Sequence, residues 1–330
     1  MQKILSFCAF LVLELFLLPI SLLGMARYTV GLTRFCGRTG VSLTAYKVAV
    51  NRWLFHQLGL RRDPMAVALL EALPITSPPL MSMLVGPTLL ALRLSGWEPG
   101  SLRSPVAQPS QAGTFVQHRT EFIDTVVREE LGGYQQVVLL GAGFDSRPYL
   151  EPMLNFDGLI FEVDREPTQR VKREALDRIE VDTSRVRYIS LDFERESLLG
   201  CLLRHGYRED ARTLFLWEGV VYYLTEQAVD TTLTFIHNHS AAGSAVVFDY
   251  FSREYLTHPP PVLKPALAWL RHIGEGWNFG IPTDPPAGER LQSFLEARGL
   301  QVARFEPFGP AWSGVRPFGG VVMAETSGST

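Results

Sequence analysis

From residue 114 onward, short apolar runs alternate with longer segments in which apolar residues recur every three or four positions. The short runs, which predict strands, lie at 137–140, 159–163, 187–191, 214–217, 245–249, 301–305 and 319–324. The longer segments, which predict helices, lie at 115–131, 166–179, 226–240 and 287–298. Buried strands separated by helices predict an α/β fold with a mostly parallel sheet covered on both faces. Such sheets bind ligands beyond the carboxyl ends of their strands.

The region before residue 114 has a different pattern. Residues 41–73 predict two helices, and the second opens at Asp63-Pro64 with proline in its first turn. The stretch at 74–94 is apolar but interrupted by prolines, so it predicts a packed cap or lid, with a second membrane-contacting surface as the alternative. Residues 95–113 are rich in Gly, Pro and Ser, which predicts a linker.

The chain begins with a strongly apolar segment at 4–23, in which fourteen of twenty residues are Leu, Ile, Phe or Val. This is about the length that crosses a bilayer as a helix. Each of those residues favours insertion by roughly 0.3 to 0.6 kcal/mol and the single acid, Glu14, costs about 3 kcal/mol, so the balance predicts a membrane anchor. Three arginines and a lysine follow, which favours a main body in the cytosol. A signal peptide cleaved near 24–26 and a buried helix kinked at Pro19 are the alternatives.

Composition and charge exclude several classes of function. The formal net charge is −3 and both signs are mixed along the chain, so no basic stripe predicts a nucleic-acid partner. The three cysteines, Cys8, Cys36 and Cys201, are an odd number without a CxxC spacing. They support neither a disulfide framework nor a zinc site and fit a reducing compartment.

A glycine turn follows the first predicted strand, in the sequence QQVVLLGAGFDSRPYL. Glycines there let the backbone approach a ligand and expose amide groups, and Gly141 and Gly143 fit this pattern. A dinucleotide fingerprint would need a third glycine where the chain has Ser146. An NAD-dependent oxidoreductase is therefore disfavoured, and a tight packing turn without a ligand is the remaining alternative.

Acidic side chains follow three later strands. Asp164 comes 21 residues after Gly143, where an acid can bind a ribose diol. Asp192 and Phe193 follow the third strand, where a carboxylate could accept an adenine amine and a ring could stack on the base. Each acid could instead be a helix cap.

Two further residues complete a candidate site. Glu218 ends the fourth strand, where its carboxylate can face a cationic group, and Arg119 lies on the helix before the first strand. An arginine can clamp a carboxylate. Acids for ribose, base and ammonium, with an arginine for a carboxylate, favour S-adenosyl-L-methionine as the ligand.

The segments VVLLGAGFDSRPY, FEVD, ISLDF, WEGVVYYL and GEGWNFGI, in this order, resemble the leucine carboxyl methyltransferase-like family, including its bacterial and natural-product O-methyltransferases. The resemblance covers about residues 41–324. It implies a Rossmann-like class I methyltransferase sheet of seven strands, the last antiparallel, with a helical cap and no metal. It implies that the cofactor is held by Arg119 at its carboxylate, Gly141 beneath its methionine part, Asp164 at the ribose, Asp192 and Phe193 at the adenine, and Glu218 at its amino or sulfonium side.

The resemblance also suggests how the chain is organised. Residues 1–26 would be an apolar segment, 27–113 a helical cap and linker, and 114–330 the methyltransferase domain, with a cap insert at about 252–288. The first forty residues are extra relative to common relatives, and Glu121 stands where another basic residue often follows the arginine motif. Both differences concern the acceptor rather than the cofactor.

Methyl transfer from a sulfonium is an in-line displacement, so a carboxylate acceptor needs no base whereas a hydroxyl acceptor does. The residues near the strand ends that could act as a base are His118, Asp145, Glu218 and Tyr250. The aromatic residues of the insert that could line an acceptor cavity are Trp269, Trp277 and Phe279, although they could simply pack the cap.

These features favour O-methylation of a small, apolar metabolite by a membrane-associated enzyme. The alternatives are a protein C-terminal leucine carboxyl methyltransferase, an inactive membrane-tethered binding protein of the same fold and, for location, a soluble cytoplasmic enzyme.

Overall fold

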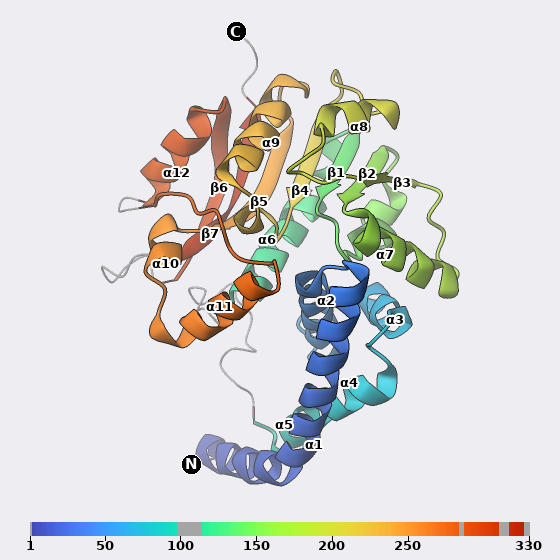
Figure 1. Ribbon diagram of the computed structural model, residues 1–330, viewed down its shortest axis with the longest axis vertical. Coiled ribbons are helices and arrows are strands. Elements are labelled where there is room, and N and C mark those ends of the chain that lie inside the picture. The colour runs from blue at the N-terminus through green and yellow to red at the C-terminus, as the bar shows by residue number, and fades with distance from the viewer. Residues whose placement is uncertain (1, 98–113, 284–286, 310–316, 327–330) are drawn as a thin grey trace. The chain divides into compact units, whose positions relative to one another are not determined.

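A computed structural model describes residues 2–97, 114–283, 287–309 and 317–326, drawn in Figure 1. The predicted linker at 95–113 lies outside the described residues from position 98 onward. The chain forms two compact units. One comprises Met1–Ser104 with Arg170–Val181, and the other comprises Pro105–Gln169 with Asp182–Thr330.

The second unit is built on a seven-stranded sheet. Its strands are β1 (Gln136–Leu140), β2 (Leu159–Asp164), β3 (Val186–Ser190), β4 (Thr213–Trp217), β5 (Ala245–Phe251), β6 (Leu300–Phe308) and β7 (Gly319–Thr326). Their order across the sheet is β3-β2-β1-β4-β5-β7-β6. The first five strands are parallel, and β7 is antiparallel to both β5 and β6. All seven predicted strands and the antiparallel last strand are confirmed.

Helices connect these strands (Figure 1). They are α6 (Phe115–Glu130), α7 (Glu166–Arg178), α8 (Leu198–Arg204), α9 (Glu226–Asn238), α10 (Arg253–Thr257), α11 (Lys264–His272) and α12 (Ala287–Glu296). Short 3-10 helices are η3 (Leu131–Gly133), η4 (Arg147–Tyr149), η5 (Met153–Asn155), η6 (Val221–Tyr223) and η7 (Pro261–Leu263). One hydrophobic core joins α8, α9 and α12 to a face of the sheet. The predicted helices are confirmed within a few residues, whereas α8, α10 and α11 were not predicted because each is short.

The first unit is helical. Its helices are α1 (Gln2–Thr39), α2 (Leu43–Gln57), α3 (Pro64–Ala72), α4 (Pro78–Leu84) and α5 (Gly86–Ser95). The side chain of Ser42 caps α2, and that of Asp63 caps α3 by accepting a hydrogen bond of 2.8 Å from the amide of Ala66. The two helices predicted at 41–73 are confirmed, and the proline-interrupted stretch forms α4 and α5.

The apolar N-terminal segment is the first part of one long helix. α1 continues past the predicted end at residue 23 as far as Thr39, with Pro19 inside it. Figure 1 shows the helix bending, as expected where proline removes a backbone donor. Its most apolar window of 18 residues has a mean hydropathy of 2.3 and contains no buried residue. Among the described residues it is the one helix that could cross a membrane by length and composition.

Candidate functional site

The glycine turn after β1 has a left-handed backbone. Gly141 has a φ of +67° and Gly143 one of +48°, which residues with a side chain rarely adopt. A Cβ atom at position 141 would also lie 2.4 Å from Cγ2 of Val220, in the turn after β4. Glycine is therefore required at 141 both for its backbone conformation and for the close approach of two turns.

Asp164 lies beside this turn, at the end of β2. Its carboxylate accepts hydrogen bonds from the backbone amides of Gly143 and Arg165, the latter at 2.6 Å. The side chain is half-buried. The fold thus brings together two predicted site residues that are 21 positions apart.

Asp192 and Phe193 follow β3, the neighbour of β2 at the edge of the sheet. One carboxylate oxygen of Asp192 accepts a hydrogen bond of 3.1 Å from the amide of Glu194, and the other lies 3.9 Å from Arg195 Nε. Phe193 is half-buried and packs against the hydrophobic core. Asp192 therefore stabilises a local turn, which agrees with the alternative that this acid is a cap. Because β3 is the neighbour of β2, Asp192 lies next to the carboxyl end of β2.

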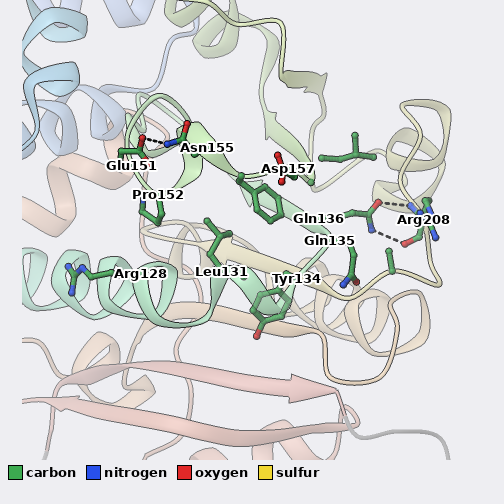
Figure 2. A pocket seen from close by; sticks show the side chains of 15 residues that line it. Arg128, Leu131, Tyr134, Gln135, Gln136, Glu151, Pro152, Asn155, Asp157 and Arg208 are labelled. Atoms are coloured by element: carbon green, nitrogen blue, oxygen red, sulfur yellow. Dashed lines mark hydrogen bonds between the residues drawn. The ribbon is translucent and has the colours of Figure 1, made fainter.

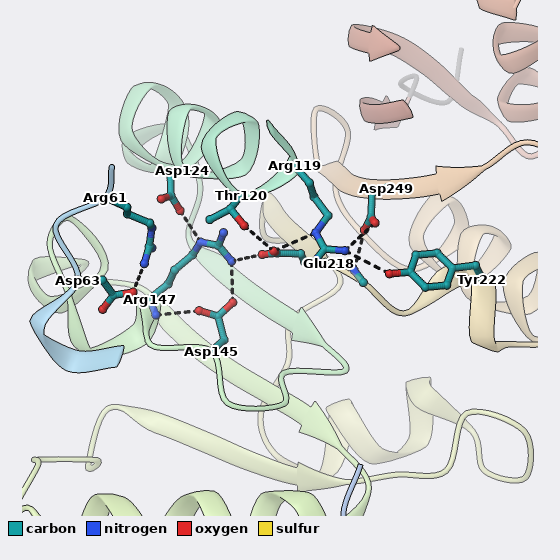
Figure 3. A network of polar contacts seen from close by, with 11 residues as sticks. Arg61, Asp63, Arg119, Thr120, Asp124, Asp145, Arg147, Glu218, Tyr222 and Asp249 are labelled. Atoms are coloured by element: carbon teal, nitrogen blue, oxygen red, sulfur yellow. Dashed lines mark hydrogen bonds and ion pairs between the residues drawn. The ribbon is translucent and has the colours of Figure 1, made fainter. Parts of the chain in front are cut away.

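Arg119 on α6 lies at the centre of a buried polar network (Figure 3). Its Nε donates to Glu218 Oε1 at 3.1 Å, and its Nη1 donates to Asp249 Oδ2 at 2.9 Å and to the Tyr222 hydroxyl at 3.2 Å. Its side chain is only 1% exposed, yet Nη2 is buried without a hydrogen-bond partner. Gly219 leaves room for the guanidinium, because a Cβ there would lie 3.3 Å from Nη2. The two N–H groups of Nη2 are thus available to donate hydrogen bonds to a ligand.

A second arginine, Arg147, extends the network from the other side of Glu218 (Figure 3). Its Nε donates to Asp124 at 2.7 Å, and its Nη1 donates to Asp145 at 2.6 Å and to Glu218 Oε2 at 2.5 Å. Its Nη2 is also buried without a partner. Our sequence reasoning did not include Arg147 in the site, although it stands only four residues after Gly143.

The network carries more negative than positive charge. Two guanidinium groups face four carboxylates, those of Asp124, Asp145, Glu218 and Asp249. Burial raises the pKa of Asp249, while Arg119 and the amide of Gly219 act in the opposite direction. Burial alone would lower the pKa of Arg119, but its acidic neighbours raise it well above its usual value, so this arginine stays charged. The excess of carboxylates suits a ligand that carries a cation.

The four predicted candidates for a catalytic base differ in their surroundings. Asp145 and Glu218 are held by arginines, as described above. Tyr250 is buried in β5, and burial raises the pKa of its hydroxyl. His118 on α6 is half-buried, and burial lowers its pKa, which keeps its imidazole neutral at neutral pH. Of the four residues, His118 is the one whose protonation state suits a general base.

The aromatic residues of the insert also differ. Trp277 stacks on Phe251 with ring centroids 4.2 Å apart and lies 5.2 Å from Tyr222, a member of the Arg119 network. Its indole Nε1 is buried without a hydrogen-bond partner. Phe279 is 2% exposed and packs within the hydrophobic core, which is the packing alternative. Trp269 lies on α11.

A pocket of about 690 Å³ lies at the opposite end of the strands (Figure 2). Gln136, the first residue of β1, and Leu159, the first residue of β2, line it together with Arg128 and Arg208. The side chain of Gln136 donates a hydrogen bond of 2.8 Å to the backbone carbonyl of Arg208. This pocket is therefore separate from the glycine turn and the Arg119 network. In the described part of the chain, no group of three or more His, Cys, Asp or Glu residues could hold a metal ion.

Comparison with known proteins gives a consistent result. The family model described as leucine carboxyl methyltransferase matches residues 52–237, a range that contains all six candidate cofactor residues. A candidate S-adenosyl-L-methionine-dependent methyltransferase of Mycolicibacterium smegmatis is 27% identical over 271 residues, covering 80% of this chain and 84% of that protein. A candidate methyltransferase of the same description from Bacillus subtilis (strain 168) is 30% identical over 141 residues, covering 42% of this chain and 46% of its own length. The match thus spans less than half of that relative.

Among solved structures, the mitomycin 7-O-methyltransferase is similar to the chain with a TM-score of 0.43 and 17% sequence identity. The similarity covers 64% of this chain and 55% of that enzyme.

Proposed function

The chain belongs to the leucine carboxyl methyltransferase family, and we propose that it transfers the methyl group of S-adenosyl-L-methionine to an oxygen of a small, apolar acceptor. The observation that carries the proposal is the buried, unpartnered Nη2 of Arg119 beside Gly219, in the turn after β4. A buried guanidinium donor without an acceptor is costly, and a ligand carboxylate would satisfy it.

The proposed binding mode uses each candidate residue for one part of the cofactor. Arg119 would bind the carboxylate through Nη2 without losing its existing bonds, and Gly141 would let the backbone approach the methionine part. Asp164 would accept hydrogen bonds from the ribose, and Asp192 and Phe193 would contact the adenine. Glu218 already accepts from Thr120 and both arginines, so its role would be to supply negative charge near the ammonium group. When bound, the cofactor supplies an electrophilic methyl group on a cationic sulfur.

Catalysis by the chain itself would come from positioning and from exclusion of water. A carboxylate acceptor is already nucleophilic, so it would need only to be aligned with the methyl group. A hydroxyl acceptor would need a base, and His118, whose burial lowers the pKa of its imidazole, is the candidate we propose.

An apolar acceptor is supported by the aromatic stack of Trp277 and Phe251 next to Tyr222. The unpartnered Nε1 of Trp277 could donate a hydrogen bond to an acceptor oxygen. A protein C-terminal carboxylate remains the second candidate acceptor because the family description names leucine carboxyl groups. An inactive binding protein is the third reading, and the intact buried network argues against it.

We further propose that the enzyme associates with a membrane through residues 4–23 and carries its methyltransferase domain, residues 114–330, in the cytosol. The support is the exposed apolar window of α1. A soluble cytoplasmic location is the alternative.

The first test is calorimetric titration of the full chain in detergent with S-adenosyl-L-methionine, S-adenosylhomocysteine and NAD. Both adenosyl ligands should bind and NAD should not. Asp164→Ala should abolish binding, whereas Asp157→Ala, at an exposed position at the other end of the strands, should leave it unchanged. Binding of NAD alone, or equal loss in both variants, would contradict the proposal. Transfer of a radiolabelled methyl group to carboxylic acids, phenols and a peptide ending in leucine would then identify the acceptor class.

A further inference from the structure

The N-terminal part of α1 has its polar and apolar faces the opposite way round from a helix in water. The large apolar side chains at 4–23 that face outward include Leu15, which is 70% exposed, and Phe16, which is 78% exposed. The three polar residues of this segment, Ser6, Glu14 and Ser21, are only half-exposed and lie on one stripe. A helix at the surface of a soluble protein keeps its apolar stripe inside and its polar face outside. This arrangement indicates an apolar surrounding medium.

The polar stripe faces the helices α4 and α5. Gly24 packs so closely on α4 that a Cβ atom there would lie 2.7 Å from the backbone of Leu84. Further along, the hydroxyl of Thr88 on α5 donates a hydrogen bond of 2.8 Å to Glu14. At the far end, the rings of Phe10 and Trp97 have centroids 4.4 Å apart. Along these three contacts the residue numbers in α1 decrease while those of the contacting residues increase. The helices α4 and α5 therefore run antiparallel to α1.

This packing resembles that of helices in lipid. Small residues at the contact let backbones approach, and polar side chains hydrogen-bond between helices because hydrocarbon offers them no partner. α5 is itself apolar on the outside, with Leu90 46% exposed and Leu94 66% exposed. The apolar surface therefore continues from α1 onto α5.

A lipid bilayer accounts for this surface better than a second protein chain does. At about 100° per residue, the exposed apolar positions of α1 cover more than half of the helix circumference. A single partner helix covers a narrower stripe, whereas acyl chains surround a helix on all free sides.

The chain that follows α5 limits how deeply the pair can insert. Residues 98–113 read EPGSLRSPVAQPSQAG, which is too polar to lie in hydrocarbon. Arg170–Val181 belongs to the N-terminal unit although the chain on either side of it belongs to the other unit. Within that unit, Arg178 donates a hydrogen bond of 3.0 Å to the backbone carbonyl of Ala72, so the chain is on the same aqueous side before α4 and again at α7.

We propose that residues 4–23 of α1 and helix α5 enter a bilayer together from one side and do not span it, with Glu14 and Thr88 paired inside. The inference rests on the membrane association proposed above and is independent of the methyltransferase activity. It assigns α5, and not α1 alone, to the lipid-contacting surface.

The test uses the full chain with vesicles of phosphatidylcholine and phosphatidylglycerol. Cys8 is exposed and Cys36 and Cys201 are buried, so Cys8 accepts an environment-sensitive fluorescent label without mutation. A second label is placed by Leu94→Cys in a Cys8→Ser background, and an aqueous control by Asp157→Cys in the same background. We expect nitroxide lipids to quench the labels at positions 8 and 94, and aqueous iodide to quench the control.

Four outcomes separate the possibilities. If the protein floats with the vesicles but the label at position 94 is quenched only by iodide, α5 does not contact lipid, and that part of the proposal is overturned. A label introduced by Lys3→Cys in the Cys8→Ser background that external dithionite cannot reduce until detergent is added would show a full span and overturn one-sided insertion. Failure to float would remove the membrane association itself, while cofactor binding would be unaffected. A lipid-independent dimer in that case would identify a second copy as the occupant.

The hydrogen bond between α1 and α5 has its own matched pair of variants. Thr88→Val removes the hydroxyl that pairs with Glu14 and should lower the floating fraction several-fold, whereas Thr88→Ser retains the hydroxyl and should not. Equal flotation of both variants would show that the pair does not contribute to insertion.

Discussion

The guanidinium of Arg119 donates a hydrogen bond of 2.9 Å to the carboxylate of Asp249, across 130 residues of sequence. Both side chains are buried, so the contact fixes how the arginine is oriented. With Nε on Glu218 and Nη1 on Asp249, only Nη2 remains for a ligand. The orientation of the proposed carboxylate clamp therefore depends on a residue at the end of β5.

Asp249→Asn should weaken both folding and cofactor binding. Removing one charge of a buried pair costs about 3 kcal/mol of unfolding free energy, and Asn, which still offers an oxygen, should cost somewhat less. Loss of the fixed guanidinium orientation should lower S-adenosyl-L-methionine affinity about tenfold, or about 1.4 kcal/mol. Denaturant unfolding and calorimetry measure the two effects. Tyr222→Phe, which removes only a hydroxyl acceptor of Arg119, should have the smaller effect on both; the reverse order would contradict this account.

Gly141→Ala should be destabilising for two separable reasons. A residue with a Cβ atom pays about 1 to 2 kcal/mol in the left-handed region, and the new methyl group would collide with Val220. Val220→Ala in the same chain should relieve the collision but not the backbone cost, so the double variant should recover only part of the loss. A double-mutant cycle of unfolding free energies measures this coupling. Strict additivity would mean that the two turns do not touch.

Arg147→Lys should impair the site although it conserves charge. Arg147 uses two nitrogens to hold Asp124, Asp145 and Glu218, and a single ammonium cannot reproduce that fork. We expect a lower unfolding midpoint and weaker cofactor binding. Arg208→Lys is the matched control, because that side chain is 63% exposed and lies at the opposite end of the strands from the proposed site. Unchanged binding in Arg147→Lys would remove Arg147 from the proposed site.

His118→Gln distinguishes the two acceptor chemistries. If the acceptor is a hydroxyl, loss of the base should reduce methyl transfer about 100-fold or more while cofactor affinity stays the same. If the acceptor is a carboxylate, the rate should change little because no proton has to be removed. The rate of transfer of a radiolabelled methyl group, with calorimetry as the control for binding, gives the answer.

Glu121→Gln should stabilise the protein at neutral pH but not in acid. Burial raises the pKa of Glu121, and Asp124 and Glu306 raise it further, while Arg128 opposes them. The folded state therefore holds this proton to higher pH than the unfolded state, so stability falls as pH rises through the interval above the usual value of about 4.3. The unfolding midpoints of the variant and the native protein should coincide at low pH. As the pH rises above the usual pKa of a glutamate, the midpoint of the variant should become the higher of the two. Separation in the opposite sense would contradict the assigned pKa direction.

Local patterns in the chain were sufficient to predict the sheet and most of its helices. A strand or helix buries one face along its length, so its apolar residues recur at a regular spacing that can be recognised in consecutive residues. For the same reason, Gly141 and Asp164 could be recognised from their positions directly after strands, and in the structure Asp164 accepts a hydrogen bond from the same turn. The family resemblance, carried by five segments, was confirmed by the family match over 52–237, which contains the first four of them.

Only the tertiary structure decided which distant side chains meet. Arg147, Asp249 and Tyr222 entered the site because the strand order places the ends of β1, β4 and β5 side by side, which no local pattern encodes. Phe279 went to the core for the same reason. The N-terminal segment was recognisable as apolar from its composition, but the packing of its polar stripe against α5 depends on which helix the fold places beside it. Composition determined that this segment is apolar, and packing determined which of its faces is shielded.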